Sequence, residues 1–295
     1  MSVECYIDLH AHSDCSDGVD TPEELVSKAR AAGLCALAIT DHDAVDGVER
    51  ARHESARRES ARCESARHES ARHESARDLE IVPGVELSAR DGDSDVHILG
   101  YFFDPGNRSL LSYLETFRSQ RLHRAKGIVR KLNDLGVPLD LESVIAHAKD
   151  GKTSVGRPHI ARALVESNQA ISIQDAFTRY LGNHAPAYLP KVFFAVEDAI
   201  RVIHEAGGAA VLAHPGSLRR DELIPGFVKS GLDGLEVIHP DHSGTARRYY
   251  GQLAAKHGLV ATGGSDYHGP RADRCGLGGM KVPLHHLTEL KRILA

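Results

Sequence analysis

Two histidines and an aspartate stand close together near the amino terminus, in the stretch IDLHAHSDCSDG. His10 and His12 are two residues apart, and Asp17 follows soon after them. In an extended chain the side chains repeat every two residues, so both imidazoles would point to one side and could hold the same metal ion. Two incidental histidines on a strand are the alternative explanation. The motif by itself is therefore only moderately specific for a metal site.

Further histidines and carboxylates occur at or near the ends of apolar segments along the chain. They are His42 in ITDHD, Glu86 in PGVE, His97 in VHILGY, His214 in AHPG, and Asp266 and His268 in GGSDYHG. Each of them alone would be taken for a surface or core residue. Together with the first three they make a set too large for one cation, which uses three or four protein ligands plus water. The set predicts two or three divalent ions, and its imidazole and carboxylate ligands suit Mn²⁺, Zn²⁺ or Fe²⁺.

Clustered divalent cations favour one kind of chemistry. They lower the pKa of a bound water and neutralise the oxygens of a phosphate ester, so we expect a metal-bound hydroxide to attack phosphorus. Cations would also let several imidazoles remain neutral while lying close together. The sequence does not identify the group that protonates the leaving alkoxide, and Asp17 and His214 are the candidates.

The elements that must position these residues can be read from the apolar pattern. The strand-like segments are CYIDLH, CALAIT, LEIVPGVE, DVHILGYFF, GGAAVLAHP, LDGLEVIHP and GLVATGGSDYH, and helical patterns mostly separate them. This alternation predicts a parallel α/β sheet or barrel, in which ligands gather at the carboxyl ends of the strands. A helix is expected over TPEELVSKARAAG, capped by Thr21, with Pro22 in its first turn and Gly33 at its end.

Two segments interrupt the strand rhythm. Residues 106–205 are mostly helical and predict an insertion, or cap, between two parts of a barrel at 1–105 and 206–295. Residues 51–77 repeat a unit close to ARHES five times. Five residues advance about 500° around a helix, so no apolar stripe persists and we expect a solvated helical extension. Metal binding by the histidines of the repeat is the weaker alternative, because their spacing does not place them on one face.

Composition limits the remaining choices. The chain has 295 residues, a formal net charge of -5 and five cysteines. The charge argues against stable binding of duplex nucleic acid, and no segment resembles a signal peptide or a membrane span, so a cytoplasmic location is expected. The cysteines form no CxxC pair, which predicts unpaired thiols in a reducing compartment.

With these motifs in view, the sequence closely resembles the PHP (polymerase and histidinol phosphatase) superfamily of metal-dependent phosphoesterases. DLHAHSDCSDG, ITDHD, PGVE, VHILGY, AHPG and GGSDYHG resemble its successive motifs, and the resemblance covers nearly the whole chain. It implies a distorted (β/α)7 barrel of the PHP type with a helical cap insertion and a trinuclear metal site. It also implies metal-ligand roles for His10, His12, Asp17, His42, Glu86, His97, His214, Asp266 and His268.

The helical insertion points to one branch of that superfamily. GRPHIARALV, AFTRYLG and PAYLPK resemble the stand-alone enzymes that include 3',5'-nucleotide bisphosphate phosphatase and the exoribonuclease RNase AM. The resemblance implies Mn²⁺ as the favoured ion and a small phosphorylated substrate, either a nucleotide bisphosphate cleaved to a nucleoside 5'-monophosphate or a short RNA trimmed from its 5' end. Arg157 and His159 are the expected phosphate contacts, and His239 and His242 could also line the pocket.

Other functions and one departure from the family pattern need to be weighed. A histidinol-phosphate phosphatase would use the same chemistry on another alcohol, and a non-catalytic PHP domain would act as a binding module. The complete ligand set argues against the second alternative. Relatives have a much shorter helix where the pentapeptide repeat stands. If the repeat displaced the strand that follows it, Glu86 would not reach the site.

Overall fold

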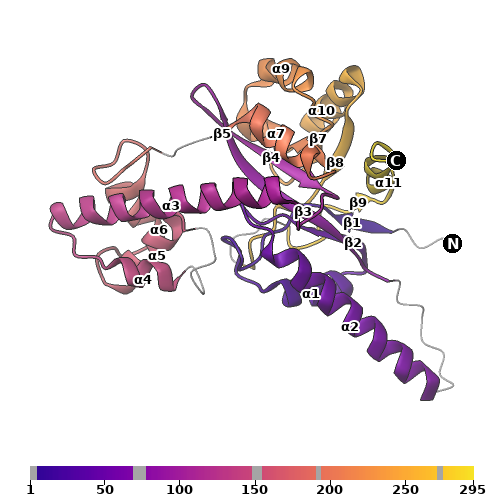
Figure 1. Ribbon diagram of the computed structural model, residues 1–295, viewed down its shortest axis with the longest axis horizontal. Helices are drawn as coiled ribbons and strands as arrows, with labels where there is room; N and C mark the ends of the chain where they lie inside the picture. The colour runs from indigo at the N-terminus through magenta and orange to yellow at the C-terminus, as the bar shows by residue number, and fades with distance from the viewer. Residues whose placement is uncertain (1–4, 69–77, 148–154, 191–193, 271–274) are drawn as a thin grey trace. The chain divides into compact units, whose positions relative to one another are not determined.

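The computed structural model describes residues 5–68, 78–147, 155–190, 194–270 and 275–295, with the side chains of 61–68 left aside. The chain divides into two compact units (Figure 1). The first comprises residues 1–111 and 194–295, and the second comprises residues 112–193. The second unit is shorter than the predicted insertion, because helix α7 (Val196–Glu205) packs against strands of the first unit.

A mixed sheet forms the centre of the first unit. Its strands are β1 (Tyr6–Asp8), β2 (Leu34–Ile39), β3 (Glu80–Asp91), β4 (Ser94–Tyr101), β5 (Phe194–Ala195), β6 (Ala209–Leu212), β7 (Gly234–Ile238), β8 (Val260–Gly263) and β9 (Val282–Pro283). Neighbouring strands follow the order β8-β7-β6-β4-β3-β2-β1-β9, and β5 pairs with β3. The sheet nearly closes on itself, since the Leu9 amide donates a hydrogen bond of 3.2 Å to the carbonyl of Gly263. The described strands therefore form a nearly closed barrel.

The direction of β4 differs from the expected parallel arrangement. It runs antiparallel to both β3 and β6, and β9 runs antiparallel to β1. The reason is local: only Gly92 and Asp93 separate β3 from β4, and a connection this short can join only antiparallel strands. This reversal explains why His97 lies inside its strand rather than at its carboxyl end.

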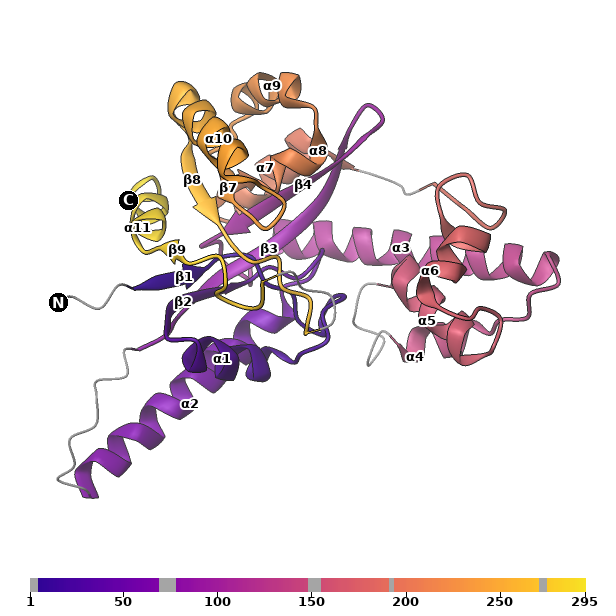
Figure 2. The same cartoon turned by 180° about the vertical axis from the view of Figure 1, so that it is seen from behind.

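Helices cover the outside of this sheet. Helices α1 (Pro22–Ala31) and α2 (Asp46–His68) pack beside β2 and β3, while α7 packs on β3, β4 and β6. Helix α10 (Gly244–His257) packs on β7 and β8, and α11 (His285–Arg292) on β8 (Figure 2). Shorter turns lie between β6 and β7, namely α8 (Pro215–Leu218), a 3-10 turn (Asp221–Leu223) and α9 (Ile224–Lys229).

Helix α1 has the ends that the sequence predicts. The Thr21 side chain accepts a hydrogen bond from the Glu24 amide, the Glu24 side chain accepts one from the Thr21 amide, and Pro22 is the first helical residue. Gly33 follows the helix with a φ of 71°. The predicted cap and stop are thus confirmed, and the helix delivers the chain directly into β2.

Helix α2 begins before the pentapeptide repeat and continues into it. Ala51 is fully buried, and Ser55 donates a hydrogen bond of 3.2 Å to the carbonyl of Leu79, just before β3. Arg30 of α1 contacts both Ser55 and Glu59. The first copy of the repeat is therefore packed against the barrel, in contrast to the fully solvated helix that was expected. Residues 69–77 lie outside the described part of the chain.

The second unit is helical. It contains most of α3 (Arg108–Asp134), then α4 (Leu141–Ala146), α5 (Arg157–Glu166), α6 (Ile173–Ala176) and a π-helical turn (Phe177–Leu181). These elements enclose a separate apolar core that includes Leu132, Val144, Ile160 and Leu164. The unit therefore has a hydrophobic core of its own.

Two further expectations concern cysteines and membranes. Cys5 and Cys35 form a disulfide with Cα atoms 5.9 Å apart, so the prediction of unpaired thiols is wrong for this pair. The pairing follows from the fold, because the parallel strands β1 and β2 run side by side at that point. No helix among the described residues is long and apolar enough to cross a membrane.

Candidate metal centre

The predicted ligands of the first unit meet at one end of the barrel. His10 and His12 follow β1, His42 follows β2, His214 follows β6, and Asp266 and His268 follow β8; Glu86 and His97 lie within β3 and β4, and Asp17 lies in the loop after β1. Four overlapping groups of potential ligand atoms occur there, each with all of its atoms within 4.8 Å of one another. These groups contain eight of the nine predicted residues, together with Glu236 and His239. The ninth, His214, lies 3.1 Å from Glu86 Oε1, so all nine come together at this end of the barrel.

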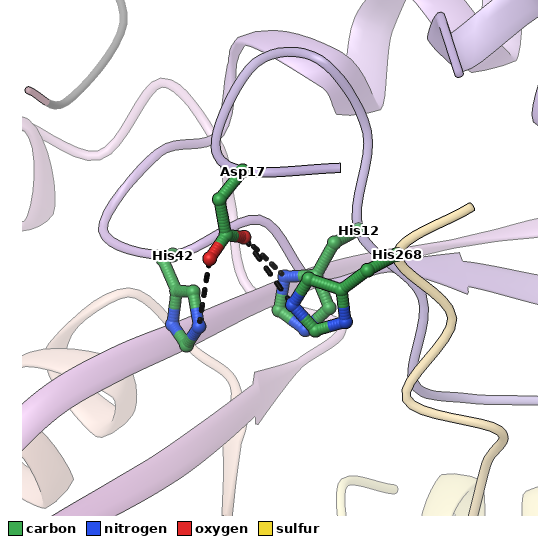
Figure 3. Close-up of side chains that lie close together, drawn as sticks. All are labelled: His12, Asp17, His42 and His268. Carbon is green, nitrogen blue, oxygen red and sulfur yellow. Dashed lines mark ion pairs between the residues drawn. The ribbon is translucent and has the colours of Figure 1, made fainter. Parts of the chain in front are cut away.

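One group surrounds Asp17 (Figure 3). Its carboxylate points toward three imidazoles that come from different segments. The Asp17 Oδ1 atom lies 3.3 Å from His268 Nε2 and 3.9 Å from His12 Nδ1, and Oδ2 lies 4.0 Å from His42 Nε2. Asp41 supports the loop that carries Asp17, since it accepts hydrogen bonds from the Ser13 amide and from the hydroxyls of Ser13 and Ser16.

A second group is more compact and more buried. His10 Nε2 and His12 Nε2 are 3.1 Å apart, and each lies 3.2 Å from Asp266 Oδ1. Glu86 Oε2 lies 3.3 Å from the first of these nitrogens and 3.2 Å from the second. Ligand atoms bound at about 2.0–2.2 Å to one ion are separated by roughly 3 Å, so these distances suit the coordination sphere of a small divalent cation.

Glu86 connects the groups, because its two oxygens face different imidazoles. Its Oε2 atom lies 3.3 Å from His42 Nδ1 in addition to the two contacts above, and Oε1 lies 2.7 Å from His97 Nδ1 and 3.1 Å from His214 Nε2. The swing of β3 that would have removed Glu86 has not occurred, since β3 pairs in register with β2. A carboxylate in this position can bridge two cations.

Unpaired buried atoms support the fit of cations to these residues. His12 Nδ1, His42 Nδ1 and Asp17 Oδ1 are buried and make no hydrogen bond of good geometry to a described residue, although each lies 3.3–3.9 Å from another side chain of the set. Such atoms are costly unless a partner satisfies them, and neutral imidazole and carboxylate are the ligand types that Mn²⁺, Fe²⁺ and Zn²⁺ accept. No cysteine belongs to any of the four groups found among the described residues. The donor set therefore fits a centre of more than one divalent ion.

The carboxylates of the centre are held ionised. Burial alone would raise the pKa of Glu86, but the imidazoles of His42, His97 and His10 outweigh it and keep the pKa well below the usual value. Burial likewise opposes ionisation of Asp266, whereas His10 and hydrogen bonds from His12 and His239 lower its pKa well below the usual range. Ionised carboxylates offer both oxygens as ligands.

Backbone geometry near the centre is unusual at two of the predicted ligands. His214 has a φ of 27° and Asp266 a φ of 52°, a region that residues other than glycine seldom adopt. The loop holding Asp266 is tied to the first loop, because the Tyr267 hydroxyl donates a hydrogen bond of 2.7 Å to Asp20 and accepts one of 2.9 Å from Lys28. Strained backbone fixed by neighbours in this way is frequent at functional sites.

Two histidines that follow β7 have different roles. His242 is satisfied within the fold: its Nδ1 donates to the Val237 carbonyl and its Nε2 accepts from the Gly216 amide. His239 Nδ1 accepts a hydrogen bond from the Asp241 amide, so the proton of the neutral ring must be on Nε2, which lies 3.4 Å from Asp266 Oδ2. His239 thus presents a hydrogen-bond donor to the centre.

Sequence reasoning missed one residue in contact with the predicted ligands. Glu236 in β7 is fully buried, and its Oε1 atom lies 2.9 Å from His10 Nδ1. The signal was present, because Glu236 is the charged residue within GLEVI, the part of the apolar segment LDGLEVIHP that forms β7. A buried acid within a strand requires partners, and the partner here is His10, one of the predicted ligands.

The two predicted phosphate contacts lie in the second unit, at the start of α5. Arg157 donates hydrogen bonds to the Leu181 carbonyl and to Asn183 Oδ1. His159 is buried, and its Nδ1 accepts a hydrogen bond of 3.0 Å from the Gly156 amide. Within the unit, both side chains therefore also stabilise the amino-terminal end of α5.

Comparison with known proteins identifies the family. Residues 8–119 match the model of the PHP domain. The 5'-3' exoribonuclease Rnm of Escherichia coli is 35% identical over 268 residues, which cover 89% of this chain and 85% of the relative. The chain belongs to the PHP family. This confirms the predicted membership, which rested on the order of the histidine and carboxylate motifs.

Other PHP-like proteins agree over nearly the whole length. The 3',5'-nucleoside bisphosphate phosphatase of Chromobacterium violaceum is 34% identical over 269 residues, covering 90% of this chain and 87% of the relative. A solved structure from Bifidobacterium adolescentis, assigned as a metal-dependent phosphoesterase, has a TM-score of 0.82 and 33% identity, and covers 96% of this chain and 94% of its own. The predicted fold class, an α/β barrel of the PHP type, is confirmed.

Proposed function

We propose that this protein is a metal-dependent phosphoesterase that hydrolyses a phosphomonoester of a nucleotide. The favoured substrate is a 3',5'-nucleotide bisphosphate, hydrolysed to a nucleoside 5'-monophosphate and inorganic phosphate. A second proposed substrate is short RNA trimmed from its 5' end, where the bond hydrolysed is a phosphodiester and the product is a nucleotide. The observation that carries the proposal is the convergence of nine nitrogen- and oxygen-bearing side chains with unpaired buried ligand atoms. The two relatives named above act, by their names, on these two substrates.

The centre is proposed to hold two or three divalent cations, with Mn²⁺ favoured. Bound cations of this kind neutralise the oxygens of a phosphate ester and activate water for attack at phosphorus. The nine residues converging at the barrel end would hold them, and the two oxygens of Glu86 face different imidazoles of this set. The predicted ligands are carboxylates and imidazoles and include no thiolate. Thiolate is the ligand that selects Zn²⁺, whereas carboxylates suit the harder ion Mn²⁺, so Mn²⁺ is favoured.

The side chains of the protein have separate proposed tasks around the substrate. Burial alone would raise the pKa of Asp17, but His42 and His268 lower it well below the usual range, so Asp17 holds a cation rather than donating a proton. The fixed Nε2 proton of His239 is a suitable donor to a phosphate oxygen. Burial would lower the pKa of His214, but hydrogen bonding to Glu86 outweighs it and raises the pKa. As a proposed ligand, His214 would bind a cation through the ring nitrogen that otherwise carries the proton, so it cannot bind a cation and protonate the leaving group at the same time.

Arg157 and His159 are proposed to bind the phosphate or the nucleotide from the second unit. The guanidinium of Arg157 lies 5.7 Å from the ring centre of Phe177 and 5.8 Å from that of Tyr188. Aromatic neighbours on a guanidinium fix its plane, and a fixed planar cation suits the two-point recognition of a phosphate. The hydrogen bonds of Arg157 within the unit would then serve to orient it.

A substrate panel tests the proposal. With added Mn²⁺, release of inorganic phosphate is measured on a 3',5'-nucleotide bisphosphate and histidinol phosphate, and release of nucleotides on a short 5'-phosphorylated RNA, beside the His10→Ala variant. His53→Ala is the matched control, since His53 is an exposed histidine of the repeat. We expect release from the bisphosphate, a loss of at least a hundredfold in His10→Ala, and normal activity in His53→Ala.

The alternative functions predict other results. Preference for histidinol phosphate would identify a histidinol-phosphate phosphatase with the same centre. Absence of hydrolysis on the whole panel, together with absence of bound metal, would favour a binding module. Normal activity of His10→Ala would show that the proposed centre is wrong.

A further inference from the structure

Glu236 contacts two of the proposed ligands at once. Its side chain is fully buried in β7. Its Oε1 atom lies 2.9 Å from Nδ1 of His10, and its Oε2 atom accepts a hydrogen bond of 2.8 Å from the backbone amide of His214. These two histidines follow different strands, β1 and β6, so a single carboxylate links segments that are far apart in the sequence.

The contact with His10 determines which ring nitrogen faces the centre. Both ring nitrogens of His10 face carboxylates, Nδ1 at Glu236 and Nε2 at Glu86 and Asp266. A neutral imidazole carries one proton, so a ring that binds a cation through Nε2 carries its proton on Nδ1, where the Glu236 carboxylate accepts it. The lone pair is then on Nε2, which lies 3.3 Å from Glu86 Oε2 and 3.2 Å from Asp266 Oδ1. Glu236 therefore presents the His10 nitrogen in the form that can bind a cation.

The contact with His214 concerns the backbone. His214 adopts φ 27° and ψ 58°, outside the regions that residues with a side chain usually occupy. A hydrogen bond from its amide to a buried ionised acceptor offsets part of the cost of this conformation. The resulting turn places His214 Nε2 3.1 Å from Glu86 Oε1.

We infer that Glu236 is a positioning residue of the metal centre, which fixes the tautomer of His10 and the backbone turn of His214. This inference rests on the proposed metal-dependent function. Each oxygen of Glu236 faces an N–H group of a proposed ligand, so the residue acts through these two ligands. Glu236 also forms a group of potential ligands with His10 and His239, and the number of ions bound at saturation distinguishes a positioning residue from a ligand. Carboxylates in this relation to a metal-binding histidine orient the ring and strengthen metal binding.

The test compares Glu236→Gln with Asp233→Asn. Glutamine has nearly the same shape but only one acceptor atom, so its amide group would face an N–H donor at either His10 or His214. Asp233, just before β7, offers a matched control: its Oδ2 atom lies 2.7 Å from His204 Nε2 and accepts a hydrogen bond of 2.8 Å from the Ala210 amide. It precedes Glu236 by three residues, about 10 Å along the strand and away from the centre.

Equilibrium dialysis against Mn²⁺, followed by metal analysis, is the main measurement. We expect Glu236→Gln to bind Mn²⁺ about 10- to 100-fold more weakly than the wild-type protein, with the same number of ions at saturation. Asp233→Asn should bind like the wild type. Wild-type affinity in Glu236→Gln would overturn the inference, and so would the loss of a whole equivalent at saturation, which would make Glu236 a ligand.

A second measurement does not depend on whether the variant folds. Nitrogen-15 NMR of the zinc-loaded wild-type protein reports the tautomer of His10, with His10→Gln used to assign the signal. A proton on Nδ1 supports the inference, and a proton on Nε2 overturns it. A wild-type protein that binds neither Mn²⁺ nor Zn²⁺ would overturn the proposed function itself, an outcome distinct from failure of Glu236 alone.

Discussion

At the scale of single residues, the imidazoles of the centre differ in how readily they can accept a cation. Burial lowers the pKa of His12, but hydrogen bonds with Asp266 and Glu86 raise it to about 10 in the metal-free protein. His42 is the opposite case, because burial lowers its pKa to about 3. His12 must lose a proton when a cation binds, whereas His42 is already neutral.

This difference predicts that metal binding depends on pH. Calorimetric titration with Mn²⁺ in two buffers of different ionisation enthalpy should show release of at least one proton per chain at pH 7.5, and affinity should increase from pH 6 to pH 8. Equal heats in both buffers would contradict the prediction.

The same pKa of His12 predicts how stability varies with pH without metal. A raised pKa contributes stability that is complete below the unfolded value of 6.5 and is lost as pH rises toward about 10. Metal-free protein should therefore melt at a lower temperature at pH 9 than at pH 6.5. The melting temperature of protein saturated with Mn²⁺ should fall less between pH 6.5 and pH 9, because the bound cations take the place of the proton on His12. Thermal unfolding of both forms measures the difference.

A single glycine permits the close approach of β8 to β1. A Cβ atom on Gly264 would lie 2.3 Å from the Cβ of His10 and 2.4 Å from its backbone nitrogen. Gly264→Ala should therefore cost about 1–3 kcal/mol in the free energy of unfolding and weaken metal binding, because the strands must separate. Gly226→Ala, where nothing lies within 4 Å, is the control and should be neutral or stabilising. Denaturant unfolding with metal analysis checks both.

The residues of the centre were predictable because each predicted ligand lies in a short motif near an apolar segment. Glu236 was not predicted, since a lone acid inside a strand shows its role only when its partners are known. The partners are His10 and His214, which lie 226 and 22 residues away in the sequence. Contacts at such separations depend on strand order, which one sequence does not specify.

At the scale of elements, the strand segments were predicted well and their directions less well. The antiparallel direction of β4 follows from the turn at Gly92, which has a φ of 55°. The dipeptide Asp91–Gly92 is a recognised hairpin signal, so the reversal was visible in the sequence. Strands and helices alternate over most of the rest of the chain, and this alternation predicted parallel strands throughout. The hairpin between β3 and β4 was therefore not predicted.

Helix α2 shows how a repeat can be partly packed. Successive five-residue copies turn by about 140°, so equivalent positions face different surroundings. Ala51 is fully buried, whereas Ala56 of the next copy is exposed. Of the two copies whose side chains the structure describes, the first faces the barrel with its alanine and the second does not.

Excision of residues 61–75, three copies of the repeat, should leave the centre intact. Residues 76–78 remain to connect Ser60 with Leu79, and they can span about 10 Å, enough to return along one and a half turns of helix. We expect unchanged Mn²⁺ content, and a free energy of unfolding within about 0.5 kcal/mol of the full chain. Ala51→Gln should destabilise the protein and Ala56→Gln should not. Loss of bound metal on excision would contradict this account.

At the scale of the whole molecule, the two kinds of predicted site residue belong to different units. All nine predicted ligands lie in the first unit, and Arg157 and His159 lie in the second. The sequence predicted the second unit because strand-like segments are absent from residues 106–205. Helix α7 has the same helical pattern as the inserted helices, so the prediction placed it in the insertion. Its assignment to the first unit comes from packing on β3, β4 and β6.

This division predicts that substrate binding and metal binding can be separated by mutation. Arg157→Lys should lower kcat/KM for the nucleotide bisphosphate by about 10- to 100-fold, because an ammonium cannot make the two-point contact of a guanidinium. Metal content should not change. Arg130→Lys, at an exposed position of α3, is the matched control and should behave as the wild type. Unaltered kinetics of Arg157→Lys would remove Arg157 from the proposed substrate site.

The central claim is that distant side chains of one barrel hold several divalent cations. Anomalous diffraction at the manganese edge, from crystals of the protein loaded with Mn²⁺, tests this claim most directly. We predict two or three anomalous peaks around Glu86, within bonding distance of His10, His12, His42 and Asp266. A single peak, no peak, or peaks elsewhere on the molecule would contradict it.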